Sequence, residues 1–205
     1  MFYIALIHNP VYNKNQKVIT TTVTNLDLHD IARAGRTYDV AKYYIVNPLD
    51  SQQELVERMR EYWASDFGAD YNSDRQEAFS VLAIKSELTE VIAEIEEREG
   101  ATPKLIASDA REYDNSIGYL ELRRKIQAQD DPYLLLLGTG WGLVADLIKD
   151  TDYILEPIYG QGDYNHLSVR SAASIILDRL LGEEWWSSAE LTSSPPVPCV
   201  TNEDS

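Results

Sequence analysis

Short apolar runs alternate with longer amphipathic stretches along most of this chain. Runs of this kind, four to six residues long and bounded by Pro, Asn, Asp or Gly, predict buried β-strands. Between them, apolar residues recur at steps of three and four, as on one face of an α-helix. Strands that alternate with helices of about 12 residues predict an α/β fold: a mostly parallel sheet with helices on both faces. The predicted strands span residues 2–7, 18–23 (or an extended lead-in), 43–46, 79–84, 104–107, 133–137 and 153–155, and the predicted helices span 25–38, 51–65, 86–99, 115–127 and 167–181.

Polar residues at the ends of these stretches predict where the helices begin and end. Thr24 is suited to cap the first helix, and Ser51 with Glu54 fits a capping box for the second. Ser86 is the expected cap of the acidic third helix, which Gly100 ends. We expect residues 67–75 to form a loop.

The last predicted helix is apolar on too many sides for a surface helix. Between Leu167 and Leu181 most side chains are Leu, Ile, Val or Ala, which leaves little polar face. Such a helix is either wrapped by its own chain or buried against a partner.

Composition places the chain among ordinary globular proteins. Apolar residues make up 44% and charged residues 25% of 205 residues, and no apolar run reaches the roughly 18 residues of a membrane span. The only cysteine, Cys199, excludes an internal disulfide framework and a cysteine zinc site. With no basic region ahead of an apolar one at the N-terminus, we expect a cytoplasmic protein. We expect one domain over residues 1–182 and a flexible acidic, Pro- and Ser-containing tail over 183–205.

The net charge of −16 argues against loose binding to nucleic acids, which phosphate contacts dominate. The charge is uneven, however. Residues 1–60 carry seven Lys/Arg and six Asp/Glu, whereas the rest carries 11 and 28. If the protein contacts a polyanion, the electrostatic field therefore allows that contact at the N-terminal third of the chain.

The apolar run 133–137 leads directly into the turn Gly138-Thr139-Gly140-Trp141-Gly142. Glycines after a strand let the backbone adopt positive φ and approach a ligand, as in nucleotide sites. A dinucleotide fold would need this turn near its first strand, but only about 65 residues follow it here. Glu156 lies at roughly the distance of a ribose-binding acid, which we treat as coincidence. The turn must serve a fold that keeps its nucleotide site near the C-terminal end.

Three C-terminal segments resemble, in order, the cofactor loops of the SPOUT methyltransferases. They are the strand and glycine loop 134–143, the proline-bearing segment 154–160, and the helix entry 164–173 with Asn165-His166-Leu167-Ser168. Residues 30–40, with Arg33 five residues before Tyr38, resemble a segment of the ribose-methylating branch. Two features differ from that branch: His29 and Asp30 replace much of its small-residue pattern, and Asp39 stands where glycine is usual. With His8-x-Pro10-Val11-Tyr12-x-Lys14 and the stretch 24–30, residues 1 to about 182 look like a subfamily of S-adenosylmethionine-dependent RNA methyltransferases.

The resemblance implies a fold, a cofactor and partners. It implies a C-terminal trefoil knot over about 133–181, S-adenosylmethionine bound within it, and a homodimer. The leading hypothesis is a methyltransferase that acts on structured RNA, tRNA or rRNA, with transfer to a ribose hydroxyl or a base nitrogen, although the resemblance does not identify the RNA target. We expect no metal, no membrane and no DNA partner.

Backbone groups of tight loops can read an adenine edge without long polar side chains, so small and apolar residues suit this cofactor. The three matching segments and the end of the strand 104–107 supply the expected contacts. They are Ala107, Ser108, Leu137, Gly138, Thr139, Gly140, Gly142, Ile158, Gly160, Asn165, His166, Leu167 and Val169.

Methyl transfer is an in-line displacement, so positioning supplies much of its rate, and the receiving group must also lose a proton. Arg33 aligns with the arginine that the resembling branch uses near its target hydroxyl, although phosphate binding suits a normally charged arginine better. Asp30 and His29, about one turn earlier, are alternative proton acceptors. Lys14, Asn25 and Arg36 are expected RNA contacts. Asn25, His29, Arg33 and Arg36 share one helix stripe, which is also what a solvated face looks like.

Two other functions remain open at this point. The fold could bind the cofactor but methylate a protein or small molecule, which the acidic charge permits. It could also be a dimeric RNA-binding or assembly protein without turnover.

Overall fold

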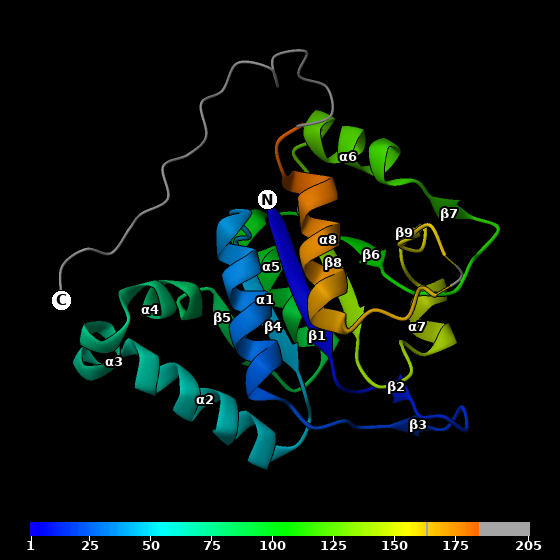
Figure 1. Cartoon of the computed structure of the whole chain (residues 1–205). Coiled ribbons are helices and arrows are strands. Elements are labelled where there is room, and N and C mark those ends of the chain that lie inside the picture. Colours follow the sequence, from blue (N-terminus) through cyan, green and yellow to red (C-terminus); the bar gives the residue numbers. More distant parts are fainter. Residues whose placement is uncertain (163, 185–205) are drawn as a thin grey trace.

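The computed structural model describes residues 1–162 and 164–184. Seven strands form one sheet in the order β5-β4-β1-β8-β6-β9-β7, with every pairing parallel (Figure 1). This confirms the predicted fold class. The strands of this sheet are β1 (Phe2–Ile7), β4 (Lys42–Val46), β5 (Leu82–Lys85), β6 (Lys104–Ala107), β7 (Ser116–Ile117), β8 (Tyr133–Gly138) and β9 (Tyr153–Leu155), and a separate antiparallel pair joins β2 (Val11–Tyr12) to β3 (Val18–Ile19).

Helices cover both faces of the sheet. Helices α1 and α8 lie in front of the strands in Figure 1, and α5 lies behind them. The front layer contains α1 (Asn25–Thr37), α2 (Asp50–Ala64), α4 (Ser73–Phe79), α6 (Tyr119–Ala128) and α8 (Val169–Leu181), with α3 (Asp66–Tyr71) packed against α2 and α4, and the back layer contains α5 (Leu88–Glu99) and α7 (Ala145–Lys149).

Each central strand feeds two cores because successive side chains point to opposite faces. In β1, Ile4 and Leu6 pack toward α1 and α8, while Ala5 and Ile7 pack toward α5 and α7. Strand β8 repeats this alternation with five consecutive buried residues. A strand buried on both faces is the expected consequence of parallel pairing with two helical layers.

The predicted caps are partly correct. Thr24 caps α1, its hydroxyl accepting from the amide of Asp27, and Gly100 ends α5 in the left-handed region. The predictions for Ser51 and Ser86 are wrong: the N-cap residues are Leu49 and Glu87, and neither gives a side-chain cap. Ser86 instead accepts a hydrogen bond from the side chain of Gln53 at 2.9 Å, so these polar residues join α2 to the end of β5.

Two predicted boundaries fail where short polar residues begin new helices. Residues 67–75 are helical on both sides of Asn72 rather than a loop, because Ser65 and Asn72 cap α3 and α4 by accepting from amides three residues ahead. Phe79 consequently ends α4, and β5 begins only at Leu82.

Three short elements, β2, β7 and α7, lack an apolar run or an amphipathic pattern long enough to be recognised from the sequence. Residues 116–117, predicted as helix, form the edge strand β7 beside β9, and α6 begins after Gly118. Strand β2 and helix α7 were not predicted, and β3 is shorter than the run 18–23.

Helix α8 is largely covered by its own chain. Ala173, Ile176, Leu177 and Leu180 are buried, and the helix packs against α1, α6 and β8. The hydroxyl of Tyr38 donates to Asp178 at 3.0 Å across the α1–α8 contact. No helix within 1–162 and 164–184 has the length and apolarity needed to span a bilayer.

Candidate functional site

A cavity of about 770 Å³ lies where β8, β6 and β9 end. Cofactor sites typically have this size and lie at the carboxyl ends of parallel strands. The three segments that the sequence singles out converge here, since 11 of the 13 expected cofactor contacts line the cavity. These are Ser108, Leu137, Gly138, Thr139, Gly140, Gly142, Ile158, Asn165, His166, Leu167 and Val169, whereas Ala107 and Gly160 lie outside its lining.

The glycine turn needs its glycines for reasons internal to the fold. A Cβ on Gly138 would lie 2.7 Å from the amide nitrogen of Leu143, closer than real Cβ contacts come. Gly140 and Gly142 have φ of 60° and 93°, which L side chains rarely adopt. The turn can therefore expose backbone to a ligand only with glycine at these positions.

A polar chain beneath the turn ties it to β1. The hydroxyl of Thr139 donates to the Ile7 carbonyl at 2.9 Å and lies 2.6 Å from the hydroxyl of Thr21, which lies 2.9 Å from Nδ1 of His8. His8 is fully buried, and burial lowers the pKa of its imidazole to about 4. The imidazole is thus neutral at pH 7, and the floor of the cavity is fixed by neutral hydrogen bonds.

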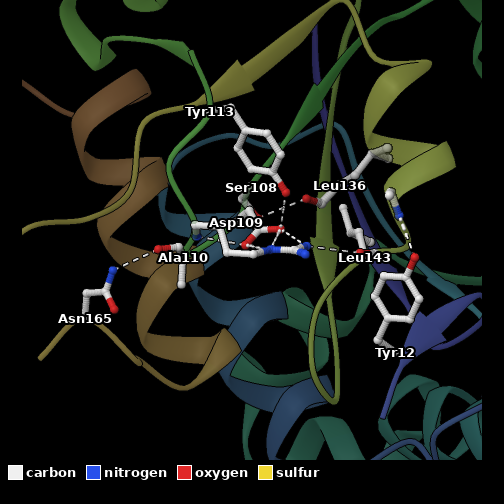
Figure 2. Close-up of polar contacts among 10 residues, drawn as sticks. Tyr12, Ser108, Asp109, Ala110, Tyr113, Leu136, Leu143 and Asn165 are labelled. Carbon is white, nitrogen blue, oxygen red and sulfur yellow. Dashed lines mark hydrogen bonds and ion pairs between the residues drawn. The ribbon is translucent and has the colours of Figure 1, made fainter. Parts of the chain in front are cut away.

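An arginine is held at the cavity by the loop that follows β6. Nε of Arg111 donates to Asp109 at 3.0 Å, and its Nη2 also donates to this carboxylate and to the carbonyl of Leu143. Tyr113 donates its hydroxyl to the same carboxylate at 3.1 Å (Figure 2). Burial first, and then the nearby Asp109 charge, raises the pKa of Tyr113 to about 12, while the bond to Asp109 raises the pKa of Arg111. Sequence reasoning selected Ser108 here but not Arg111.

The helix entry is anchored to this same loop. The side-chain amide of Asn165 donates to the carbonyl of Ala110 at 2.8 Å (Figure 2). Ser168 then caps α8 by accepting from the amide of Ser171. Leu167 and Val169 line the same cavity as Leu137 and Ile158, and apolar side chains of this kind suit a flat aromatic ring.

Helix α1 reaches the cavity through its first turn only. Thr24 and Asp27 line the cavity, although sequence reasoning did not place them in the site. Asp27 is 9% exposed, accepts from the hydroxyl of Thr24 at 2.6 Å, and lies 3.7 Å from Nε of Arg170. The sequence reveals the cap at Thr24, but only the packed structure shows that α1 begins at this cavity.

The three residues predicted to be catalytic lie outside the cavity lining of their own chain. His29 packs against Phe79 and Trp63, with ring centroids 4.6 and 5.6 Å away, and burial lowers the pKa of its imidazole. Asp30 lies 3.7 Å from Nε of Arg170, and Arg33 is exposed. Their catalytic assignment stays a prediction.

The predicted RNA contacts also lie outside the lining. Lys14 is exposed between β2 and β3, and Asn25 is exposed at the start of α1. Arg36 pairs with Glu77 at 2.8 Å and with Asp39 at 3.5 Å. Among the described residues, no cluster of His, Cys, Asp and Glu has the geometry of a metal site.

Comparisons with known proteins agree with this geometry. A family model described as SAM-dependent RNA methyltransferase matches residues 1–182. An uncharacterized protein of Aquifex aeolicus is 48% identical over 178 residues, 87% of each chain. A tRNA (guanine-N(1)-)-methyltransferase of Oleidesulfovibrio alaskensis is 41% identical over 181 residues, which are 88% of this chain but only 42% of that relative.

Solved structures share the fold at low identity. TrmJ from Z. mobilis aligns with a TM-score of 0.60 and 13% identity, covering 90% of this chain and 70% of that one. An AdoMet-bound rRNA methyltransferase from Sinorhizobium meliloti aligns with a TM-score of 0.52 and 17% identity, covering 87% and 55%.

Proposed function

The chain belongs to the family of S-adenosylmethionine-dependent RNA methyltransferases, and from this premise we propose that it methylates a structured RNA, tRNA or rRNA, at a ribose hydroxyl or a base nitrogen. The observation that carries the proposal is the convergence of three separate C-terminal segments on one cavity. A tRNA substrate is favoured because two relatives that share 41% and 36% identity with this chain are named tRNA methyltransferases. This chain spans 42% of each, so the choice of RNA is part of the proposal.

The cavity fits the cofactor in size and in chemistry. Its apolar lining residues, among them Leu137, Ile158 and Leu167, suit an adenine, and the glycine turn offers backbone groups to the ring edge. Asp27 and Glu156 line the wall with carboxylates, which suit the positive sulfonium and amino groups. Gly160 and Ala107 remain proposed contacts of lower rank, because neither lines the cavity.

Binding and orientation are the main work of the protein in this reaction. When bound, S-adenosylmethionine supplies an electrophilic methyl group. The chain must hold the adenosyl group still and admit the acceptor atom on the opposite side of that methyl group. Asp27 is a carboxylate on the cavity wall that could accept the proton of the acceptor, together with the predicted candidates His29, Asp30 and Arg33.

Exposed aromatic residues beside the cavity favour an RNA substrate despite the acidic charge. Trp141 and Tyr164 are 63% and 76% exposed, and Tyr159 is 52% exposed. Proteins that recognise unpaired RNA bases stack them on such side chains, which requires no net positive charge. We propose that these residues receive the target region, with Lys14, Asn25 and Arg36 as more distant contacts.

We further propose that residues 1–182 form one domain with a trefoil knot near 133–181, and that the protein is a cytoplasmic homodimer. Leu26 and Leu167 support the dimer, because they are 59% and 42% exposed near the linked ends of α1 and α8. Light scattering on the purified protein tests the dimer, and a monomer would reject it. The predicted tail begins at residue 183, and all but its first two residues lie outside the described part.

The proposed activity is tested by incubating the protein with radiolabelled S-adenosylmethionine and RNA from a strain that lacks its gene. Label should enter one RNA species, and mass spectrometry of nucleosides should identify the modified position. Labelled protein or metabolite instead would favour a non-RNA substrate. Cofactor binding without transfer would favour a non-catalytic role, and calorimetry that detects no cofactor binding would reject the proposal.

The catalytic role predicted for residues on α1 can be tested separately. Arg33→Ala should leave the affinity for S-adenosylmethionine unchanged but reduce transfer at least about 100-fold, since one lost charged interaction with the acceptor region costs roughly 3 kcal/mol. Normal turnover would remove Arg33 from the catalytic list.

A further inference from the structure

Arg111 is the only lysine or arginine among the described residues that line the cavity. Three carboxylates line it as well: Asp27, Asp109 and Glu156. Asp109 is paired with Arg111 and Asp27 lies 3.7 Å from Nε of Arg170, so the wall combines acidic side chains with one guanidinium of its own. S-adenosylmethionine carries groups of both signs as well, two cationic groups and one carboxylate.

The guanidinium of Arg111 is oriented with donors to spare. Asp109 occupies the edge formed by Nε and Nη2, and the Leu143 carbonyl takes a second bond from Nη2 at 3.4 Å. Nη1 makes no hydrogen bond within the described part of the chain, so two N–H donors are left for a ligand. The Arg111 side chain is 46% exposed, whereas that of Asp109 is 6% exposed, so Arg111 is the solvent-facing member of the pair.

Gly142 leaves room beside this pair. The site of a Cβ on Gly142 would lie 3.8 Å from Nη2 of Arg111 and 3.9 Å from the Asp109 carboxylate. A ligand held by the glycine turn can therefore extend to Arg111 without crossing a side chain at residue 142. Gly142 and Arg111 line the same cavity from the loops that follow β8 and β6 respectively.

On this basis we propose that Arg111, oriented by Asp109, binds the carboxylate of the methionine portion of S-adenosylmethionine. The proposal rests on the function proposed above and assigns a residue to one end of the ligand. An RNA phosphate is the other anion that could meet this guanidinium. The pairing with Asp109 leaves no net charge to attract a polyanion, but it leaves directed donors that suit one carboxylate.

The test compares two ligands that differ only in this carboxylate. Calorimetry would measure the dissociation constants of S-adenosylmethionine and of decarboxylated S-adenosylmethionine with the wild type and with Arg111→Ala. Loss of a charge-assisted hydrogen bond predicts roughly 10- to 100-fold weaker binding of S-adenosylmethionine to the variant. The decarboxylated ligand should bind both proteins within about twofold, because it lacks the group that Arg111 contacts.

Two variants and an RNA measurement make the outcome specific. Arg111→Gln, which can still donate to Asp109, should lose the carboxylate preference while the thermal stability changes little, and Arg124→Ala on the exposed face of α6 should change nothing. Equal weakening of both ligands by Arg111→Ala would overturn the proposal. So would unchanged cofactor binding with weaker tRNA binding and a salt slope smaller by about one, the result expected of a phosphate contact.

Failure of this proposal is separable from failure of the proposed function. A wild type that binds neither ligand would reject both. A wild type that binds S-adenosylmethionine and transfers methyl to RNA, but whose Arg111 variants keep the full preference for the carboxylate, would reject the role of Arg111 alone.

Discussion

Strands β4 and β8 flank β1 in the same sheet and point the same way, yet their carboxyl ends differ. Beyond β4, Asn47 is fully buried: its side chain donates to the Thr21 carbonyl at 3.0 Å and accepts from the Leu49 amide at 3.1 Å. Gln53 closes the region by donating to the Asn47 carbonyl. Beyond β8, three glycines turn the chain away and leave a cavity. The end of a strand can form a binding site when the residues that follow it neither bond its polar groups nor fill the space beside it.

A substitution that distorts the glycine turn at the end of β8 should have the largest effect on cofactor binding. In Gly140→Val, a Cβ would lie 3.0 Å from the Tyr12 carbonyl at a φ of 60°, so a branched side chain forces the turn to move. We expect affinity for S-adenosylmethionine to fall at least about 100-fold, from a combined strain of roughly 3 kcal/mol. Calorimetry measures this change.

Gly162→Ala is the matched control for that experiment. No atom lies within 4 Å of the site of its Cβ, and Gly162 is neither in the cavity lining nor among the proposed cofactor contacts. Its affinity should match the wild type within about twofold. If Gly140→Val binds as tightly as the control, the glycine turn is not a wall of the cofactor site.

Acid should weaken the link between the two strand ends. His8 follows β1, donates its amide to Val46 of β4 at 2.9 Å, and contacts Thr21 below the glycine turn. Burial lowers the pKa of His8 from 6.5 to about 4, so between these pH values the unfolded chain binds a proton that the folded chain does not. The stability from neutral His8 is complete above pH 6.5 and is lost as pH falls toward 4, by about 3 kcal/mol.

Urea unfolding at several pH values measures that loss. His8→Gln removes the titrating group, so the difference in unfolding free energy between wild type and variant should shrink with falling pH. A difference that stays constant from pH 7 to pH 4 would contradict a neutral, buried His8.

Removing Asn47 from the filled end of β4 should have the smallest effect on the cofactor cavity. Asn47→Ala removes two buried hydrogen bonds and leaves their backbone partners unsatisfied, so we expect a loss of about 2 kcal/mol in unfolding free energy. Affinity for S-adenosylmethionine should change less than about threefold, because Asn47 does not line the cavity. Thermal melts and calorimetry on one sample distinguish the two quantities, and a binding loss as large as that of Gly140→Val would erase the contrast between the two ends.

Backbone-defined features were the ones that sequence reasoning could predict. Glycines that require positive φ, a threonine cap and strongly apolar strands each follow from local chemistry, and the structure contains them at the expected positions. Their convergence on one cavity also follows, since parallel strand ends meet at one edge.

Features that depend on how helices rotate and pack were not predictable in the same way. The stripe of His29 and Arg33 was visible in the sequence, but only the packed structure shows Thr24 and Asp27 at the cavity and His29 against Trp63. Arg111 gave no periodic signal, because its orientation depends on a carboxylate two residues earlier and on a carbonyl in the loop after β8.

The turn after β8 is hydrogen-bonded to a distant part of the chain through Tyr12. The Tyr12 carbonyl accepts from the Trp141 amide at 2.9 Å, its amide donates to the Gly142 carbonyl at 3.0 Å, and its hydroxyl accepts from the Ala145 amide at 3.3 Å. A graft of residues 138–145 onto another scaffold must therefore include the β2–β3 hairpin, because this hairpin holds the turn in its conformation. For the same reason, chimaeras between members of this family should exchange both pieces together or neither.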